Sequence, residues 1–188
     1  MYSKISSANV IGVDGFLVDV EVDISNGIPS VILVGLAETS VKEAKERVMS
    51  AIKNMGFSMP SKKIRINLAP ADMRKEGSLF DLPIAIGILS ALGYIDYSEF
   101  YKKYVIIGEL SLDGKIRKVK GVLPICLMAR ELNYEGIIVP YENRYEASIV
   151  DDIKVYPFDN LIDVVKFLRG ELNKEPFDEK KEDFTNAY

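Results

Sequence analysis

The side chains best suited to catalysis are few in this sequence, and histidine is not among them. The chain has 188 residues, with no histidine and a single cysteine, Cys126. Without histidine there can be no Ser-His or Cys-His nucleophile pair, no histidine general base and hardly any zinc site. One cysteine allows neither an internal disulfide nor a multi-thiolate metal site. Cys126 lies in an apolar run with Leu123, Ile125 and Leu127, which favours a buried, inert thiol.

Four cationic side chains could instead bind phosphate groups. Lys63 and Arg65 alternate with apolar residues in a strand-like run, so they should share one face. Arg74 and Lys75 follow in the next loop. Since phosphate binding needs several cations on one accessible surface, Lys63, Arg65, Arg74 and Lys75 are the candidate DNA-binding residues. Lysine is also placed on edge strands to block aggregation, and this alternative explains the same pattern.

Composition sets broad limits on the class of protein. Hydrophobic residues make up 48% of the chain, enough for an ordinary core. The formal charge is −4, and −3 of it lies from Glu171 onward, so overall charge gives no argument for nucleic acid. No apolar run approaches the length of a membrane span, and the N-terminus lacks the pattern of a secretory signal. We therefore expect a cytoplasmic protein that does not contact a membrane.

The first third of the sequence is rich in strand-forming residues. Strands are predicted at residues 7–13, 16–24 and 29–34, with turns at Asp14-Gly15 and Asn26-Gly27. In the second run Val18, Val20 and Val22 alternate with acidic residues, which indicates a half-buried strand. A helix is expected to start at a capping box of Ser40 and Glu43 and to stop at Gly56.

The rest of the chain alternates between strands and helices. Residues 69–78 should form an irregular loop, and Asp81 should cap the next helix. The expected elements are a strand at 62–68, a core helix at 82–92, a hairpin of 104–111 with 115–119 across Asp113-Gly114, helices at 122–132, 143–148 and 161–169, and strands at 136–139 and 153–155. This order predicts an α/β fold with one mixed sheet covered mainly on one face by helices. Residues 1–170 would form the domain, and 171–188 a charged linker.

Several long motifs are more specific than these patterns. Residues 34–44 read VGLAETSVKEA and residues 63–72 read KIRINLAPAD, followed by KEG at 75–77, FDLPIA at 80–85, GEL at 108–110 and DG at 113–114. Together they closely resemble the N-terminal domain of the magnesium-chelatase-like AAA+ ATPases, the ComM/YifB family. The resemblance runs from about Ile11 to Arg169. It implies a fold like ribosomal protein S5 domain 2, shared with the proteolytic domain of Lon and the C-terminal domain of RadA.

The resemblance also implies a following AAA+ domain that would bind ATP and magnesium. Members of the family are similar to hexameric DNA motors that extend branches when incoming single strands recombine during natural transformation. The phosphate-binding motif G-x-x-x-x-G-K-[ST] occurs nowhere in these residues. We therefore expect no cofactor and no ATP hydrolysis in this chain. The expected partners are its own AAA+ domain, neighbouring subunits of a hexamer, and single-stranded or branched DNA.

The likeness to Lon raises the question of a Ser-Lys protease, which needs no histidine. Lon carries its nucleophile in a turn just before the core helix, and the position matching that serine is Leu79. Ser78 comes one place early, and the position matching the Lon lysine falls near Leu123. The nearest lysines are Lys118 and Lys120. We therefore expect no catalytic residues and a vestigial turn formed by Glu76, Gly77, Ser78 and Leu79.

Three functions remain compatible with the sequence. The domain could assist DNA binding or ring assembly in its motor. It could instead be a structural collar without DNA contact, in which Asp19, Glu21 and Asp23 face a basic partner surface or simply keep the strand soluble. The third alternative is a residual Ser-Lys peptidase.

Overall fold

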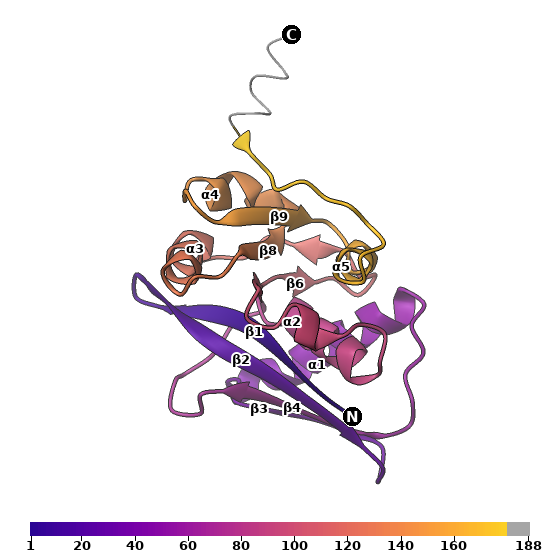
Figure 1. The fold of residues 1–188 in the computed structure, drawn as a ribbon. Coiled ribbons are helices and arrows are strands. Elements are labelled where there is room, and N and C mark those ends of the chain that lie inside the picture. The colour runs from indigo at the N-terminus through magenta and orange to yellow at the C-terminus, as the bar shows by residue number, and fades with distance from the viewer. Residues whose placement is uncertain (180–188) are drawn as a thin grey trace.

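A computed structural model describes residues 1–179 and shows an α/β fold, which confirms the predicted class (Figure 1). No helix within this part of the chain has the length and apolar character needed to cross a membrane. The elements are β1 (Tyr2–Ile11), β2 (Asp14–Ser25), β3 (Ser30–Val34), α1 (Glu38–Asn54), β4 (Lys63–Ala69), α2 (Asp81–Ala91), η1 (Tyr97–Glu99), β5 (Tyr104–Ile106), β6 (Glu109–Leu110), β7 (Ile116–Arg117), α3 (Val122–Glu131), β8 (Gly136–Pro140), η2 (Tyr141–Asn143), α4 (Arg144–Ser148), β9 (Lys154–Phe158) and α5 (Leu161–Leu168).

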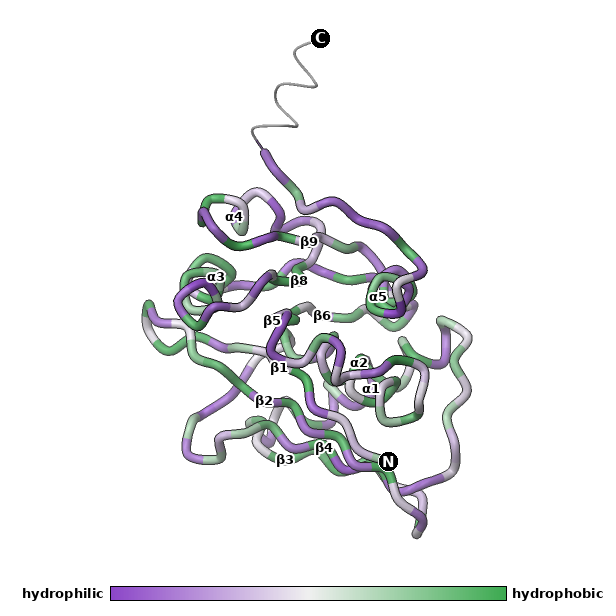
Figure 2. Tube along the Cα trace, viewed as in Figure 1, coloured by the Kyte–Doolittle hydropathy of each residue, from purple (hydrophilic) through white to green (hydrophobic). Residues whose placement is uncertain are grey.

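The amino-terminal half builds a four-stranded sheet in the order β1-β2-β4-β3. β1, β2 and β4 pair antiparallel, whereas β3 pairs parallel with β4. The alternation predicted for β2 is confirmed, because Val18, Val20 and Val22 are all buried beneath the helices. Figure 2 shows hydrophobic and hydrophilic residues alternating along β2 and β4. α1 and α2 lie on one face of this sheet (Figure 1).

The β1–β2 hairpin differs from the prediction in its turn and its start. β1 begins at Tyr2 rather than at residue 7. Ile11 pairs with Asp14, so the turn is Gly12-Val13, and Asp14-Gly15 lies within β2. Gly12 has a φ of 62°, a value that glycine adopts at little cost. The dipeptide Asp14-Gly15 suits a tight turn equally well. The pairing register of β1 with β2 decides between a turn at Gly12-Val13 and one at Asp14-Gly15.

The two helices on the sheet are not capped as predicted. α1 begins at Glu38 after Ala37, which supplies no side-chain cap, so the predicted box of Ser40 and Glu43 falls inside the helix. α1 does end before Gly56, as expected. Every residue of α2 is buried, in agreement with its predicted place in the core. Asp81 does not cap α2. Its carboxylate instead accepts hydrogen bonds from Arg47 and from the Leu110 N–H.

The carboxy-terminal half corrects the expectation of a single sheet. β5, β8 and β9 form a parallel three-stranded sheet, and β6 and β7 form a separate two-stranded sheet. The predicted hairpin of residues 104–111 with 115–119 is therefore limited to its central residues, because β5 belongs to the parallel sheet. Side chains of β1 tie the two halves together. The Ser7 hydroxyl donates to the Ile106 carbonyl at 2.7 Å, and the Tyr134 hydroxyl donates to Ser6 Oγ at 2.9 Å.

The first part of the predicted linker is docked on the domain. The Phe177 N–H donates to the Val155 carbonyl at 2.7 Å, which occupies a main-chain group of β9, the outer strand of the parallel sheet. The Phe177 ring packs edge-on against Tyr145 with centroids 5.3 Å apart, and Lys174 lies 4.5 Å from the Phe158 ring centroid. Residues 180–188, the rest of the predicted linker, lie outside the described residues.

Phe177→Ala is expected to lower the free energy of unfolding by about 1 kcal/mol, because a half-buried ring and its edge-on contact with Tyr145 are lost. Amide hydrogen exchange at β9 should accelerate in the same variant. Chemical denaturation and exchange measurements test both effects, with Glu175→Ala as an exposed control in the same segment. Equal behaviour of the two variants would show that the segment is not held by Phe177.

Candidate functional site

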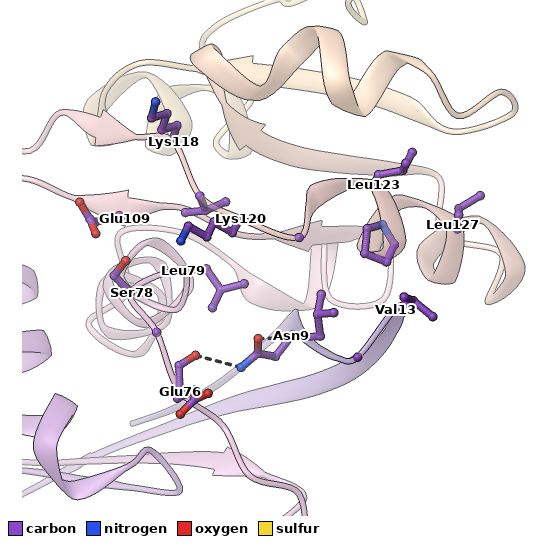
Figure 3. A pocket seen from close by; sticks show the side chains of 16 residues that line it. Asn9, Val13, Glu76, Ser78, Leu79, Glu109, Lys118, Lys120, Leu123 and Leu127 are labelled. Carbon is purple, nitrogen blue, oxygen red and sulfur yellow. Dashed lines mark hydrogen bonds between the residues drawn. The ribbon is translucent and has the colours of Figure 1, made fainter.

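A cleft of about 840 Å³ opens between the β1–β2 hairpin tip, the loop before α2 and the start of α3 (Figure 3). Its wall includes Ser78 and Leu79 from the turn that the sequence matches to the Lon nucleophile. Lys118 and Lys120 line the same cleft from the chain after β7. The structure therefore brings the predicted vestigial turn and the two nearest lysines to one place.

Main-chain hydrogen bonds fix the turn before α2. The Asp81 N–H donates to the Ser78 carbonyl at 3.1 Å, and the Gly108 N–H donates to the Leu79 carbonyl at 2.9 Å. The Asn9 side-chain amide donates to the Glu76 carbonyl at 3.0 Å (Figure 3). Leu79 is buried, so the position matched to the nucleophile holds an apolar side chain that packs into the core.

The lysines at the cleft are unlike those of a Ser-Lys dyad. A dyad needs a lysine shielded from water and within hydrogen-bond reach of the serine. Lys118 and Lys120 are both exposed. Within residues 1–179, no hydrogen bond joins the Ser78 hydroxyl to a lysine amine.

Lys75 is the lysine that the fold sequesters, and it is only 1% exposed. Its ammonium donates to the Pro70 carbonyl and to the Met73 carbonyl, the latter at 2.6 Å. Burial lowers the pKa of Lys75. The Ala37 N–H donates to the Lys75 carbonyl at 3.0 Å, which joins this loop to the start of α1. Lys75 was expected on an accessible surface with the other DNA-binding candidates, but the structure buries it and its charge is used inside the loop.

The other cationic candidates lie on surfaces of mixed charge. β4 carries Lys63 and Arg65, which share its outer face as predicted, but Arg65 stands opposite Asp23 of β2. β4 lies between β2 and β3, so the edge-strand explanation for its cations does not apply. Arg74 is exposed on the loop and pairs with Glu76 at 3.3 Å.

Acidic side chains of β2 also have partners on this face. Asp19 lies 3.8 Å from the Lys4 amine and accepts a hydrogen bond from the Tyr101 hydroxyl at 3.2 Å. Glu21 accepts from the Tyr2 hydroxyl and from the Asn67 amide, both at 3.0 Å. Positive and negative groups thus alternate across the sheet, and neither sign dominates.

Comparison with known families assigns this fold. The sequence model described as "Subunit ChlI of Mg-chelatase" matches residues 20–143, which is most of the domain. The chain belongs to this ChlI family. The competence protein ComM of Haemophilus influenzae is 47% identical over 171 residues, which cover 91% of this chain and 32% of that protein. The protein YifB of Escherichia coli is 41% identical over 168 residues, covering 89% of this chain and 33% of YifB.

The ChlI-family domain also resembles a protease. Lon protease 2 of Bacillus subtilis is 26% identical over 150 residues, which cover 73% of this chain and 26% of the protease. This similarity supports the predicted Lon-like, S5 domain 2-like fold. The chain spans about a third of the length of the ComM and YifB relatives.

The structure confirms the expected burial of Cys126. Desolvation raises the pKa of its thiol to about 12.

The sequence did not predict two other features of the ChlI-family domain, the contacts of Asp81 and the burial of Lys75. The role of Asp81 was not expected. Its carboxylate accepts from Arg47 Nε at 2.7 Å and Nη2 at 3.2 Å, and from the Leu110 N–H at 3.1 Å.

The Asp81 carboxylate therefore links α1, α2 and β6. Burial raises its pKa to about 6, although Arg47 and the Leu110 N–H act in the opposite direction. The only hint of this ion pair in the sequence was Arg47 on the charged side of α1. Glu43, four residues earlier on the same helix, is an equally suitable partner for Arg47. In the structure Glu43 lies 4.0 Å from Arg47 and is largely exposed. The second missed feature is the burial of Lys75.

Proposed function

We propose that this ChlI-family domain is a non-catalytic assembly module of a larger ATP-driven motor that acts on DNA. The motor is inferred from the resemblance to magnesium-chelatase-like AAA+ ATPases, which also suggests that ATP and magnesium bind in a following domain. The proposal that the domain itself is non-catalytic depends on one observation. The cleft holds Leu79 at the position that the sequence matches to the Lon nucleophile, with exposed lysines nearby.

An assembly role is favoured over DNA contact by the distribution of charge. DNA binding through the sheet would need an accessible surface on which cations outnumber anions. Instead, Lys75 is buried and Arg65 stands opposite Asp23. A surface of mixed charge suits contact with another folded domain, where complementary charges fix orientation more than they add affinity. Such a domain would act as a collar that sets the position of its motor and of neighbouring subunits.

Deleting the domain from a full-length protein of this family tests the assembly role. We expect ring formation, followed by sedimentation velocity, to need at least tenfold more protein, since contacts between neighbouring subunits are lost. ATP hydrolysis per subunit in assembled rings should change by less than about twofold. Unchanged assembly with a selective loss of DNA affinity would contradict the assembly role.

DNA contact is the second candidate function, and the exposure of Arg65 beside Lys63 supports it. Binding of the isolated chain to single-stranded and forked DNA can be titrated at ~50 and ~200 mM salt, over which phosphate contacts weaken steeply. Under the assembly proposal, Lys63→Glu with Arg65→Glu changes affinity by no more than about twofold. Lys42→Glu with Lys53→Glu, on exposed positions of α1, is the charge-matched control. Steeply salt-dependent binding lost only in the first variant would favour DNA contact.

A further inference from the structure

We infer that the cleft beside Ser78 binds an extended polypeptide segment that carries apolar side chains and a carboxylate, and holds it without cleaving it. This inference rests on the proposed non-catalytic character of the domain and adds a ligand to the same site. Three features of the cleft carry it: apolar walls and, within residues 1–179, open main-chain groups at Lys118 and Lys120 and the absence of an ion pair at either lysine.

The main-chain segment is fixed by Asn143, whose side chain is almost fully buried. Its Oδ1 accepts from the Val119 N–H at 2.9 Å, and its Nδ2 donates to the Val119 carbonyl at 3.0 Å. One residue directs its N–H and its carbonyl to the same side only when the chain is extended. Asn143 thus imitates one pair of a neighbouring strand at Val119, just before the chain bends at Lys120.

The residues on either side of Val119 leave their main-chain groups open. Within residues 1–179, the N–H and carbonyl groups of Lys118 and Lys120 take part in no hydrogen bond. In an extended segment these groups point away from Asn143, and both residues line the cleft. An open strand edge of this kind can pair with an incoming extended peptide, whose main chain supplies the complementary groups.

The walls of the cleft favour apolar side chains in the occupant. Val13 at the hairpin tip is 85% exposed and Leu127 on α3 is 37% exposed, and both line the cleft. Leu123 lies between them and the lysines, and Leu79 lies beneath (Figure 3). Apolar side chains gathered at the rim of a hollow are typical of a protein interaction site. Alternate side chains of an extended peptide could be buried against them.

The charges that line the cleft favour a peptide over a nucleic acid as its occupant. Lys118 and Lys120 have no carboxylate within 4.0 Å anywhere in the described part of the chain. They can therefore pair with an acidic side chain of the occupant. Glu76 and Glu109 line the cleft as well. Two carboxylates would repel a phosphate backbone, whereas a peptide can place a single carboxylate against the lysines.

The test uses a fluorescein-labelled, C-terminally amidated peptide with one glutamate, Gly-Gln-Leu-Val-Leu-Glu-Gly, with the isolated chain. We expect fluorescence polarisation to report binding, and the amide NMR signals of Lys118 and Lys120 to shift on titration. N-methylation of the two leucines should weaken binding at least tenfold, because main-chain donors are removed. No binding and no amide shifts at 1 mM peptide would overturn the inference.

Variants assign the binding to the cleft. Leu123→Asp should weaken binding at least tenfold, and aspartate in the first turn of α3 is compatible with the helix. Leu132→Asp, at an exposed site after the same helix and outside the cleft, should stay within twofold of the unchanged protein. Lys118→Glu with Lys120→Glu should weaken binding of the glutamate peptide more than binding of the same peptide with glutamine in place of glutamate. Equal effects of Leu123→Asp and Leu132→Asp would contradict the assignment.

Two further outcomes separate this inference from the proposed function. Mass spectrometry after overnight incubation should recover the peptide intact. Cleavage of a bound peptide would contradict the non-catalytic proposal and the inference that the peptide is held intact, while binding without cleavage supports both. An intact but unbound peptide would overturn the inference alone. Binding of an oligothymidine probe in the cleft instead of the peptide would overturn it in favour of nucleic acid.

Discussion

Arg47→Met is expected to lower the free energy of unfolding by about 3 kcal/mol at pH 8, because it leaves a buried carboxylate without its cation. Asp81 is 1% exposed, and Arg47 supplies two of the hydrogen bonds that its carboxylate accepts. Methionine keeps much of the length of the side chain, so the loss should come mainly from charge. Urea denaturation of the two proteins measures the difference.

The cost of Arg47→Met should fall when the pH is lowered to 5. In the unchanged protein the pKa of Asp81 is about 6, and without Arg47 it should rise further. At pH 5 Asp81 is then mostly protonated with or without Arg47, so little charge is left for Arg47 to neutralise. Adding Asp81→Asn to Arg47→Met should remove the pH dependence. A cost that is equal at pH 5 and pH 8 would show that Arg47 acts by packing alone.

Asp81 also gives the unchanged protein a defined pH dependence. Its pKa is raised from 3.8 to about 6 in the folded state, so the folded protein holds a proton that the unfolded chain releases. The resulting contribution to stability is complete below pH 3.8 and is lost as the pH rises through 6. Relative to Asp81→Asn, the unchanged protein should therefore gain stability as the pH is lowered from 7 to 5. A constant difference over this range would contradict the raised pKa.

Lys75→Met is expected to cost about 2–4 kcal/mol, the second large effect. The Lys75 ammonium is buried and donates to the carbonyls of Pro70 and Met73, and methionine would leave both acceptors without this donor. The same loop leads into the turn at Ser78, so its NMR signals should broaden. Arg74→Met, on the exposed neighbour, is the matched control and should stay within about 0.5 kcal/mol of the unchanged protein. Similar costs for the two variants would contradict the structural role of Lys75.

Local patterns predicted most of the elements, and the exceptions have physical reasons. The core helix α2 was predicted because its residues are nearly all apolar, and the structure buries all of them. The turn after β1 was misplaced, because Gly12-Val13 and Asp14-Gly15 satisfy the same local preference and only pairing with β2 decides. The division of the strands into three sheets could not be read from the sequence, since β5 pairs with β8 rather than with a neighbour in sequence.

Charged residues were the least predictable part of the candidate site. A lysine in a polar loop is normally exposed, so nothing local distinguished Lys75 from Arg74. Only the fold brings the carbonyls of Pro70 and Met73 around its amine. Asp81 lies at the start of α2, where an aspartate often caps the helix. In the structure its carboxylate instead binds Arg47, 34 residues away in the sequence, which only the tertiary fold brings close. The resemblance pointed to the turn at Ser78 and Leu79, and the structure places both residues in the wall of the cleft.

We expect this domain to keep a Lon-like fold without Lon-like chemistry. Hydrolysis of fluorescently labelled casein by the isolated chain, compared with Ser78→Ala and with Lys118→Met plus Lys120→Met, tests this most directly. We predict that all three proteins match the rate of a buffer blank over a day. Hydrolysis above the blank that disappears in both Ser78→Ala and the double lysine variant would contradict the account.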